Sequence, residues 1–101
     1  MNTWEQWRQI QSSLSRGTIV CNWTAAKGFL DDTFVVETIP EHAIVIRAPR
    51  ATNLQHISRA DVETTLHLWC KYCVGSLQRQ ELRDLTRFPK YIISILKHGG
   101  I

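Results

Sequence analysis

Apolar residues change their spacing part-way along this chain. In the first half they gather in three short blocks of strand composition, over residues 18–23, 33–39 and 43–48. The last two blocks are joined by the short connection 40–42, which is typical of an antiparallel hairpin. From residue 58 onwards, apolar residues recur every three or four positions, as on one face of a helix. Because strands and helices are segregated, the sequence predicts an α+β fold, with helices packed on one face of a small three-stranded antiparallel sheet.

The expected order is one helix, three strands and then three helices, all in a single domain of residues 1–101. The predicted helices cover residues 4–15, 59–74, 78–85 and 89–98. Thr3 and Ser58 are the expected N-caps of the first two helices. Residues 49–57 are expected to be irregular. One face of the first strand is expected to carry Ile19, Cys21 and Trp23.

The composition is that of an ordinary globular domain, with 44% hydrophobic residues and no apolar run long enough to cross a membrane. Residues 1–5 lack the basic start and apolar block of a signal peptide, so a cytoplasmic location is expected. The net charge of +3 is uneven, since residues 49–101 hold eight Lys/Arg and four Asp/Glu, whereas residues 1–48 hold four and five. A basic half can meet an acidic partner such as nucleic acid, and it can equally be a solvated surface.

None of the reactive residues falls in a pattern that predicts catalysis or metal binding. Cys70 and Cys73 form a C-x-x-C near the C-terminal end of a helix, where the helix dipole opposes a thiolate. Zinc needs about four ligands, and Cys21 could join the pair only if the fold placed it there. We therefore expect Cys70 and Cys73 to be small core residues, and Asp31-Asp32 to belong to a turn or loop. The sequence predicts no enzyme, no cofactor and no metal site.

The four tryptophans are the strongest oddity of the composition. They are Trp4, Trp7, Trp23 and Trp69. Core packing explains most of them, because a buried indole contributes a large apolar area. The functional alternative is an aromatic pocket that binds a base or an organic cation.

Residues 80–97 resemble a helix-turn-helix, with a short helix, a tight connection and a second helix. On that register Lys90, Tyr91 and Ser94 would face DNA, and Arg87 would lie near a phosphate.

Two positions depart from the helix-turn-helix pattern, and two further residues argue against docking in a groove. Arg83 stands where a small residue usually packs, and Arg87 stands where the turn usually has glycine. Ile92 and Ile95 leave the second helix apolar nearly all round, which favours burial over docking in a groove.

The stretch from Ile57 to His98 is also similar to uncharacterised small α+β domains of bacterial mobile DNA, which occur alone or beside restriction-type nucleases. The matching residues are Ile57-Ser58-Arg59-Ala60-Asp61, Trp69, Tyr72, Gly75, Arg79, Glu81-Leu82 and Tyr91-Ile92-Ile93-Ser94-Ile95-Leu96. Val62 departs from the pattern, which has an aromatic residue there. The size of the chain further resembles that of orphan proteins encoded in integron gene cassettes. The resemblance implies that the protein belongs to a bacterial mobile element. It does not point to any catalysed reaction.

These observations lead to the hypothesis of a non-enzymatic binding module whose partner is DNA or a DNA-processing protein. The residues expected to contact it are Arg50, Arg79, Arg83, Arg87, Lys90 and Tyr91. One alternative is a small-molecule binder with a cavity lined by Trp and Tyr. Another is a protein-interaction domain that acts as a homodimer, because the broad apolar face of the long helix exceeds what a small sheet can cover. That interface would consist of Leu68, Trp69 and Tyr72.

Overall fold

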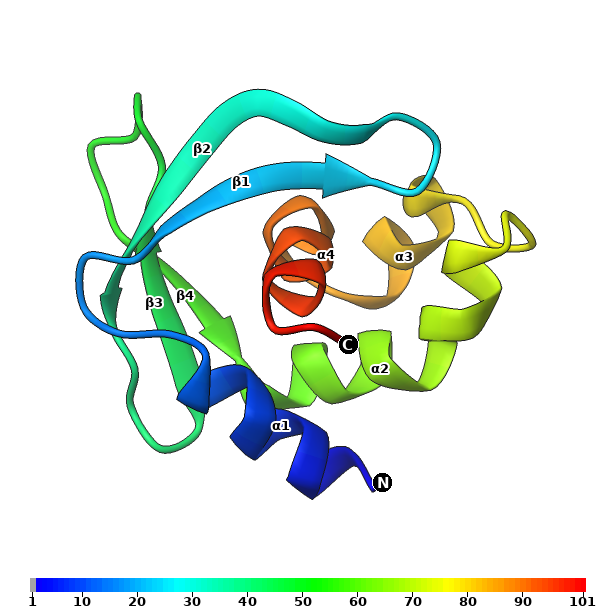
Figure 1. The fold of residues 1–101 in the computed structure, drawn as a ribbon, viewed down its shortest axis with the longest axis horizontal. Coiled ribbons are helices and arrows are strands. Elements are labelled where there is room, and N and C mark those ends of the chain that lie inside the picture. The colour runs from blue at the N-terminus through cyan, green and yellow to red at the C-terminus, as the bar shows by residue number, and fades with distance from the viewer. Residues whose placement is uncertain (1) are drawn as a thin grey trace.

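The computed structural model describes residues 2–101, which form four helices and a four-stranded sheet (Figure 1). In chain order the elements are α1 (Thr3–Ser12), β1 (Ile19–Thr24), β2 (Gly28–Thr38), β3 (Ala43–Arg47), β4 (Gln55–Ser58), α2 (Arg59–Cys73), α3 (Arg79–Leu85) and α4 (Pro89–His98). The predicted α+β class is confirmed. Within the described residues, no helix has the length and apolar character needed to span a membrane.

The sheet is an antiparallel meander in the order β1-β2-β3-β4, one strand more than predicted. The extra strand, β4, includes the end of the segment that was expected to be irregular, and that expectation is wrong for residues 55–57. Ile57 is fully buried and pairs with Ile44 of β3. A strand of four residues with one buried position carries too little alternation to be recognised from sequence, and only its pairing with β3 makes it a strand.

Helix α4 lies at the centre of the molecule. The sheet curves around it, and α1 and α2 run along the side that the sheet leaves open (Figure 1). All five residues from Ile92 to Leu96 are buried. The prediction that Ile92 and Ile95 favour burial is therefore confirmed, because a helix enclosed on several sides needs apolar residues on more than one face.

Strand β1 buries Val20 and Asn22, so the face shared by Ile19 and Cys21 is the exposed one. Ile19 is 62% exposed. Trp23 is partly buried against the core because the pairing of β1 changes register just before it. The sequence of β1 has apolar residues on both faces, and its alternation alone does not tell which face points inward.

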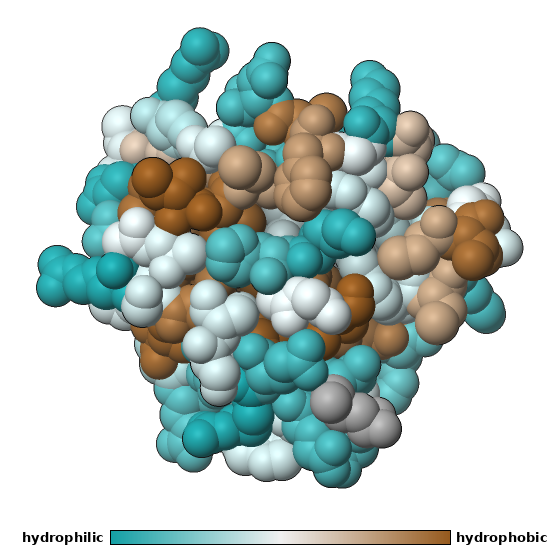
Figure 2. Space-filling model, viewed as in Figure 1, coloured by the Kyte–Doolittle hydropathy of each residue, from teal (hydrophilic) through white to brown (hydrophobic). Residues whose placement is uncertain are grey.

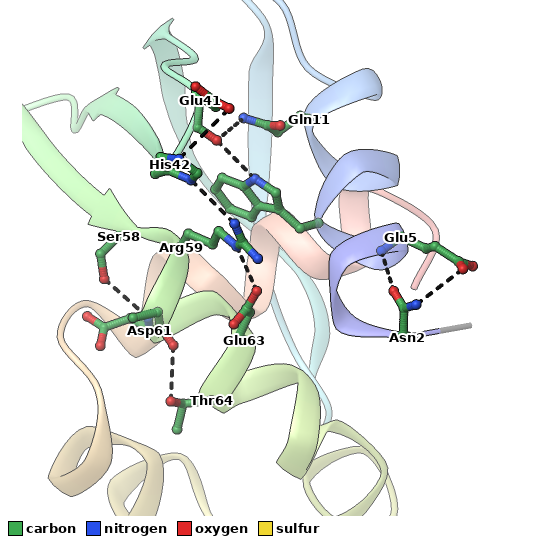
Figure 3. A network of polar contacts seen from close by, with 12 residues as sticks. Asn2, Glu5, Gln11, Glu41, His42, Ser58, Arg59, Asp61, Glu63 and Thr64 are labelled. Atoms are coloured by element: carbon green, nitrogen blue, oxygen red, sulfur yellow. Dashed lines mark hydrogen bonds and ion pairs between the residues drawn. The ribbon is translucent and has the colours of Figure 1, made fainter.

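Side-chain hydrogen bonds tie α1 to the turn between β2 and β3 (Figure 3). Gln11 donates to the backbone carbonyls of Pro40 at 2.8 Å and of Glu41 at 3.3 Å. The indole Nε1 of Trp7, which is fully buried, donates to the Glu41 carbonyl at 3.1 Å. The first tryptophan-bearing helix is thus held in place by its polar as well as its apolar atoms.

Two side chains cap the first two helices. Ser58 is confirmed as the N-cap of α2, where its hydroxyl accepts the backbone N–H of Asp61 at 3.1 Å. Asn2, and not Thr3, caps α1 by accepting the backbone N–H of Glu5 at 2.8 Å. Asn and Thr are both good caps, so the sequence placed this boundary one residue late.

The broad face of α2 is covered within the chain. Trp69 is 8% exposed and Tyr72 is 5% exposed. The ring of Trp23 lies against both, with centroid separations of 6.0 and 6.4 Å. Leu68 is half-buried. The premise that this helix has more apolar surface than the monomer can cover is therefore wrong for Trp69 and Tyr72, because the end of β1 reaches across to them.

The rest of the apolar surface is divided. On the face shown in Figure 2, hydrophobic residues form separate patches between hydrophilic ones. Leu85 is 59% exposed, whereas Leu82 of the same helix is fully buried. Helix α3 contributes a single buried residue because it is only two turns long.

Candidate functional site

A cleft of about 440 Å³ opens between the sheet, the loop after β3 and the first turn of α4, and we call it the Asn22 cleft. Four separate stretches of the chain form its walls. The lining residues are Asn22, Asp32, Thr33, Ala48, Pro49, Arg50, Ala51, Lys90 and Tyr91. Its volume lies within the range of pockets that bind small molecules or single groups of a larger ligand.

An irregularity in the pairing of β1 with β2 shapes this cleft. Cys21 pairs with Thr33, and the next pair joins Trp23 to Phe29. Between these pairs β1 has one residue, Asn22, whereas β2 has three, residues 30–32. Extra residues on one strand bend it and redirect its side chains, and such bulges occur frequently beside functional sites.

Asn22 contributes the most unusual atom of the cleft. The residue is 3% exposed, and its side-chain Oδ1 has no hydrogen-bond partner among the described residues. Nearly all buried polar side-chain atoms in proteins have a partner, because an unpaired acceptor loses its hydrogen bonds to water without replacement. The buried amide oxygen therefore costs the protein stability where β1 meets the cleft.

Tyr91 forms the aromatic part of the cleft, and the turn before α4 positions it. Phe88 adopts a left-handed backbone conformation, with φ of 56°, and Pro89 then begins the helix. A side chain other than glycine is strained in this region, and such strain is frequent at functional sites. The ring of Tyr91 packs edge-on against Phe34 at 5.1 Å and lies 6.4 Å from Phe88. These contacts hold the half-buried tyrosine ring in one orientation.

Two cations and one carboxylate complete the cleft. Arg50, Lys90 and Asp32 are all exposed. Among the described residues none of the three forms an ion pair within 4 Å, whereas Arg59, the first residue of α2, is paired with Glu63 at 2.7 Å. The charges of the Asn22 cleft are thus available to a ligand.

The fold places the predicted contact residues at different parts of the surface. Arg50, Lys90 and Tyr91 meet in the Asn22 cleft. Arg83 and Arg87 are exposed outside its lining, with the guanidinium of Arg87 over the Phe88 ring at 5.4 Å. Arg79 lines a different cleft.

The expectation that Ser94 faces DNA is wrong. Ser94 is 1% exposed, and its hydroxyl accepts the backbone N–H of Trp23 at 3.0 Å and donates to the Lys90 carbonyl at 3.1 Å. With the middle of α4 buried in this way, only the two ends of the helix reach the surface, at Lys90 and at Lys97 and His98. The residue in the left-handed turn is also Phe88, one position after Arg87, where the pattern of a helix-turn-helix would have glycine.

The second cleft has a volume of about 630 Å³ and lies beside the C-terminal end of α2; we call it the Tyr72 cleft. Its lining includes Lys27, Tyr72, Cys73 and Arg79. The hydroxyl of Tyr72 accepts the backbone N–H of Ala25 at 3.2 Å, so its main polar group is already used within the protein.

Cys70 and Cys73 are exposed, which corrects the expectation that they are core residues. They lie at the edge of the apolar face of α2, where Trp69 and Tyr72 take the inward positions. Burial of part of the side chain raises the pKa of the Cys73 thiol, and the neighbouring Cys70 raises it further while Lys97 lowers it. A raised pKa keeps the thiol protonated and unreactive near neutral pH. The described residues contain no group of three or more potential metal ligands.

Sequence reasoning missed Asn22, Asp32 and Thr33 as cleft residues. Asp31-Asp32 was expected to belong to a turn or loop, but both residues lie in β2. Two adjacent aspartates within a strand are unusual, and this was the one available signal that the strand is irregular there. Asn22 gave no signal, because a single polar residue in a strand usually faces solvent.

No family model, curated protein or solved structure matches this chain.

Proposed function

We propose that the protein is a binding module for single-stranded nucleic acid, and that the Asn22 cleft receives one nucleotide of the strand. The observation that supports this is the meeting of Arg50, Lys90 and Tyr91, from two distant segments, around one cavity. A nucleotide combines a planar base with an anionic phosphate. An aromatic ring beside unpaired cations provides a partner for each of these two parts.

A single strand suits this surface better than a duplex. A helix that reads the major groove must project from the protein, and α4 is buried from Ile92 to Leu96. A concave cleft instead admits a base that is not paired in a duplex. Proteins of this kind combine a basic path for the backbone with aromatic side chains for the bases.

The surface beyond the cleft is consistent with a strand rather than an isolated ligand. Arg87 precedes Lys90 by one short turn and is exposed, and Arg83 is exposed on the last turn of α3. These two arginines would extend the basic path away from the cleft. The resemblance of residues 57–98 to domains of bacterial mobile DNA agrees with such a role.

Fluorescence polarisation with a short labelled DNA strand of mixed sequence at low salt tests the proposal. The double variant Arg50→Ala/Lys90→Ala is expected to weaken binding by an order of magnitude or more, since two phosphate contacts are lost. The dependence of the logarithm of the binding constant on the logarithm of salt concentration should become shallower by roughly 0.7 for each lost contact.

The double variant Lys27→Ala/Arg79→Ala is the matched control. It removes the same charge from the Tyr72 cleft. We expect this variant to retain most of the affinity, with a nearly unchanged salt dependence. An equal loss in both double variants would show that binding depends on net charge and not on the Asn22 cleft, and no binding of any single strand by the unaltered protein would refute the proposed function.

A further inference from the structure

The Tyr72 cleft has no part in the proposed function. It lies between the turn that joins β1 to β2 and the loop that joins α2 to α3 (Figure 1). Gly75, with a φ of 83°, follows the end of α2, and its backbone N–H donates to the Tyr72 carbonyl at 3.1 Å. The N–H of Ser76 donates to the Lys71 carbonyl at 2.9 Å. This Schellman-type ending turns the chain, so that residues 77–79 line the cleft.

The charged side chains of the Tyr72 cleft are all of one sign. Lys27 comes from the turn between β1 and β2, and Arg79 is the first residue of α3. No Asp or Glu is among the described residues that line this cleft. Within the described part of the chain, neither cation is in an ion pair within 4 Å. The Asn22 cleft has Asp32 beside its cations, so the Tyr72 cleft is the more strongly biased towards an anion.

Apolar side chains make up much of the remaining lining. Leu30, Val74 and Leu77 line the cleft together with two alanines of the β1–β2 turn. Val74 is 77% exposed, the largest value among the large hydrophobic side chains of the described residues. A ligand that covers these side chains removes apolar surface from water, which favours binding. The lining therefore suits a molecule that has an apolar chain as well as an anionic group.

We infer that the Tyr72 cleft is a second ligand site, which binds an aliphatic carboxylate of medium chain length. The carboxylate lies by Lys27 and Arg79, because a guanidinium presents two parallel N–H donors that match its two oxygens. The aliphatic chain covers Leu30, Val74 and Leu77. A cleft of about 630 Å³ is in the range of sites that hold small molecules.

The thiol of Cys73 provides a direct readout, because it is exposed and lines the cleft. The protein is alkylated with iodoacetamide, with and without sodium octanoate below its micelle concentration, and each cysteine is followed by mass spectrometry. Trypsin cleavage after Lys71 separates Cys70 from Cys73. When octanoate is present at about ten times its dissociation constant, alkylation of Cys73 should slow about tenfold. Cys21, exposed on the outer face of the sheet, is the internal reference and should react at an unchanged rate.

Two further probes separate the contributions of charge and chain. Octylammonium has the same chain with the opposite charge, and it should protect Cys73 little because the two cations repel it. Butanoate has the same carboxylate with four fewer CH₂ groups, and it should bind at least about tenfold more weakly.

The double variant Lys27→Ala/Arg79→Ala should bind octanoate about tenfold more weakly, since both partners of the carboxylate are lost. Arg50→Ala/Lys90→Ala removes the same charge from the Asn22 cleft and should protect Cys73 as the unaltered protein does. Rates with and without octanoate are compared within each variant, so a change in the reactivity of the thiol itself cancels. Thermal melting establishes that both variants are folded.

The inference is overturned if octanoate does not protect Cys73 in the unaltered protein, or if octylammonium protects it equally. Equal slowing of Cys21 and Cys73 would also overturn it, since octanoate would then associate with the protein at no particular site. Undiminished protection in the folded Lys27→Ala/Arg79→Ala variant would remove the assigned partners of the carboxylate and refute the site. The measurement contains no nucleic acid, so this site and the nucleic-acid site can each be refuted without the other.

Discussion

The Asn22 cleft and the Tyr72 cleft have similar kinds of lining residue. They differ in whether a polar side-chain group at the cleft has a hydrogen-bond partner within the protein. Each has a tyrosine and an arginine in its lining, and the Tyr72 cleft is the larger of the two. In the Tyr72 cleft the tyrosine hydroxyl binds the backbone of Ala25, whereas in the Asn22 cleft a buried amide oxygen has no partner among the described residues. Two clefts of similar volume thus differ in how far their polar groups are satisfied within the protein, so volume alone does not distinguish a binding site from a gap between elements.

The largest expected effect on binding comes from replacing Tyr91, the aromatic side chain of the Asn22 cleft. Tyr91→Ala should weaken binding of single-stranded DNA by roughly ten- to a hundredfold, since stacking on an aromatic residue contributes about 1–3 kcal/mol per base. Fluorescence polarisation measures the change. Tyr91→Phe keeps the ring and its packing against Phe34, and should bind nearly as well as the unaltered protein. A large loss in Tyr91→Phe would mean that the hydroxyl, and not the ring, contacts the ligand.

In the Tyr72 cleft the corresponding change affects stability and not binding. Tyr72→Phe removes the acceptor for the Ala25 N–H, and the free energy of unfolding should fall by about 1 kcal/mol. Urea denaturation followed by tryptophan fluorescence measures this. DNA affinity should remain unchanged, and a loss of affinity would show that the two clefts do not have separate roles.

Asn22→Val should have the opposite effect on stability from Tyr72→Phe. It removes an unpaired buried acceptor from a strand and introduces a residue with high strand propensity, so the free energy of unfolding should rise by up to about 1 kcal/mol. The same denaturation experiment measures it. A clear loss of stability would indicate that the amide makes a stabilising contact in the free protein, and the contrast between the two clefts would then disappear.

The smallest expected effect concerns the thiol that lines the Tyr72 cleft. Cys70 raises the pKa of Cys73, so Cys70→Ser should lower that pKa and increase the fraction of Cys73 thiolate at a pH just below it. Alkylation of Cys73, followed by mass spectrometry, should therefore become modestly faster at mildly alkaline pH. An unchanged rate would mean that burial alone, the larger cause, controls this thiol. Thermal stability should change little, because Cys70 is exposed.

Several features of the fold could be predicted from local patterns. Apolar spacing identified the α+β class, three of the four strands and all four helices. Ser58 was recognised as a helix cap because its side chain acts within a few residues of its own position. Strand β4 was missed because four residues with one buried position become a strand only through pairing with β3.

The burial of α4 could be predicted from the amino-acid sequence alone, because Ile92 and Ile95 leave the helix apolar on more than one face. The sequence also placed Arg50, Lys90 and Tyr91 among the candidate contacts. That these three residues share a cleft, and that Arg79 lines another, follows only from the packing of the whole chain. The same holds for Asn22, which points inward because it lies on the same face of β1 as the buried Val20. Hydrophobic spacing and capping act over a few residues and can be read from the chain, whereas a cleft joins segments separated by tens of residues and exists only once they have packed together.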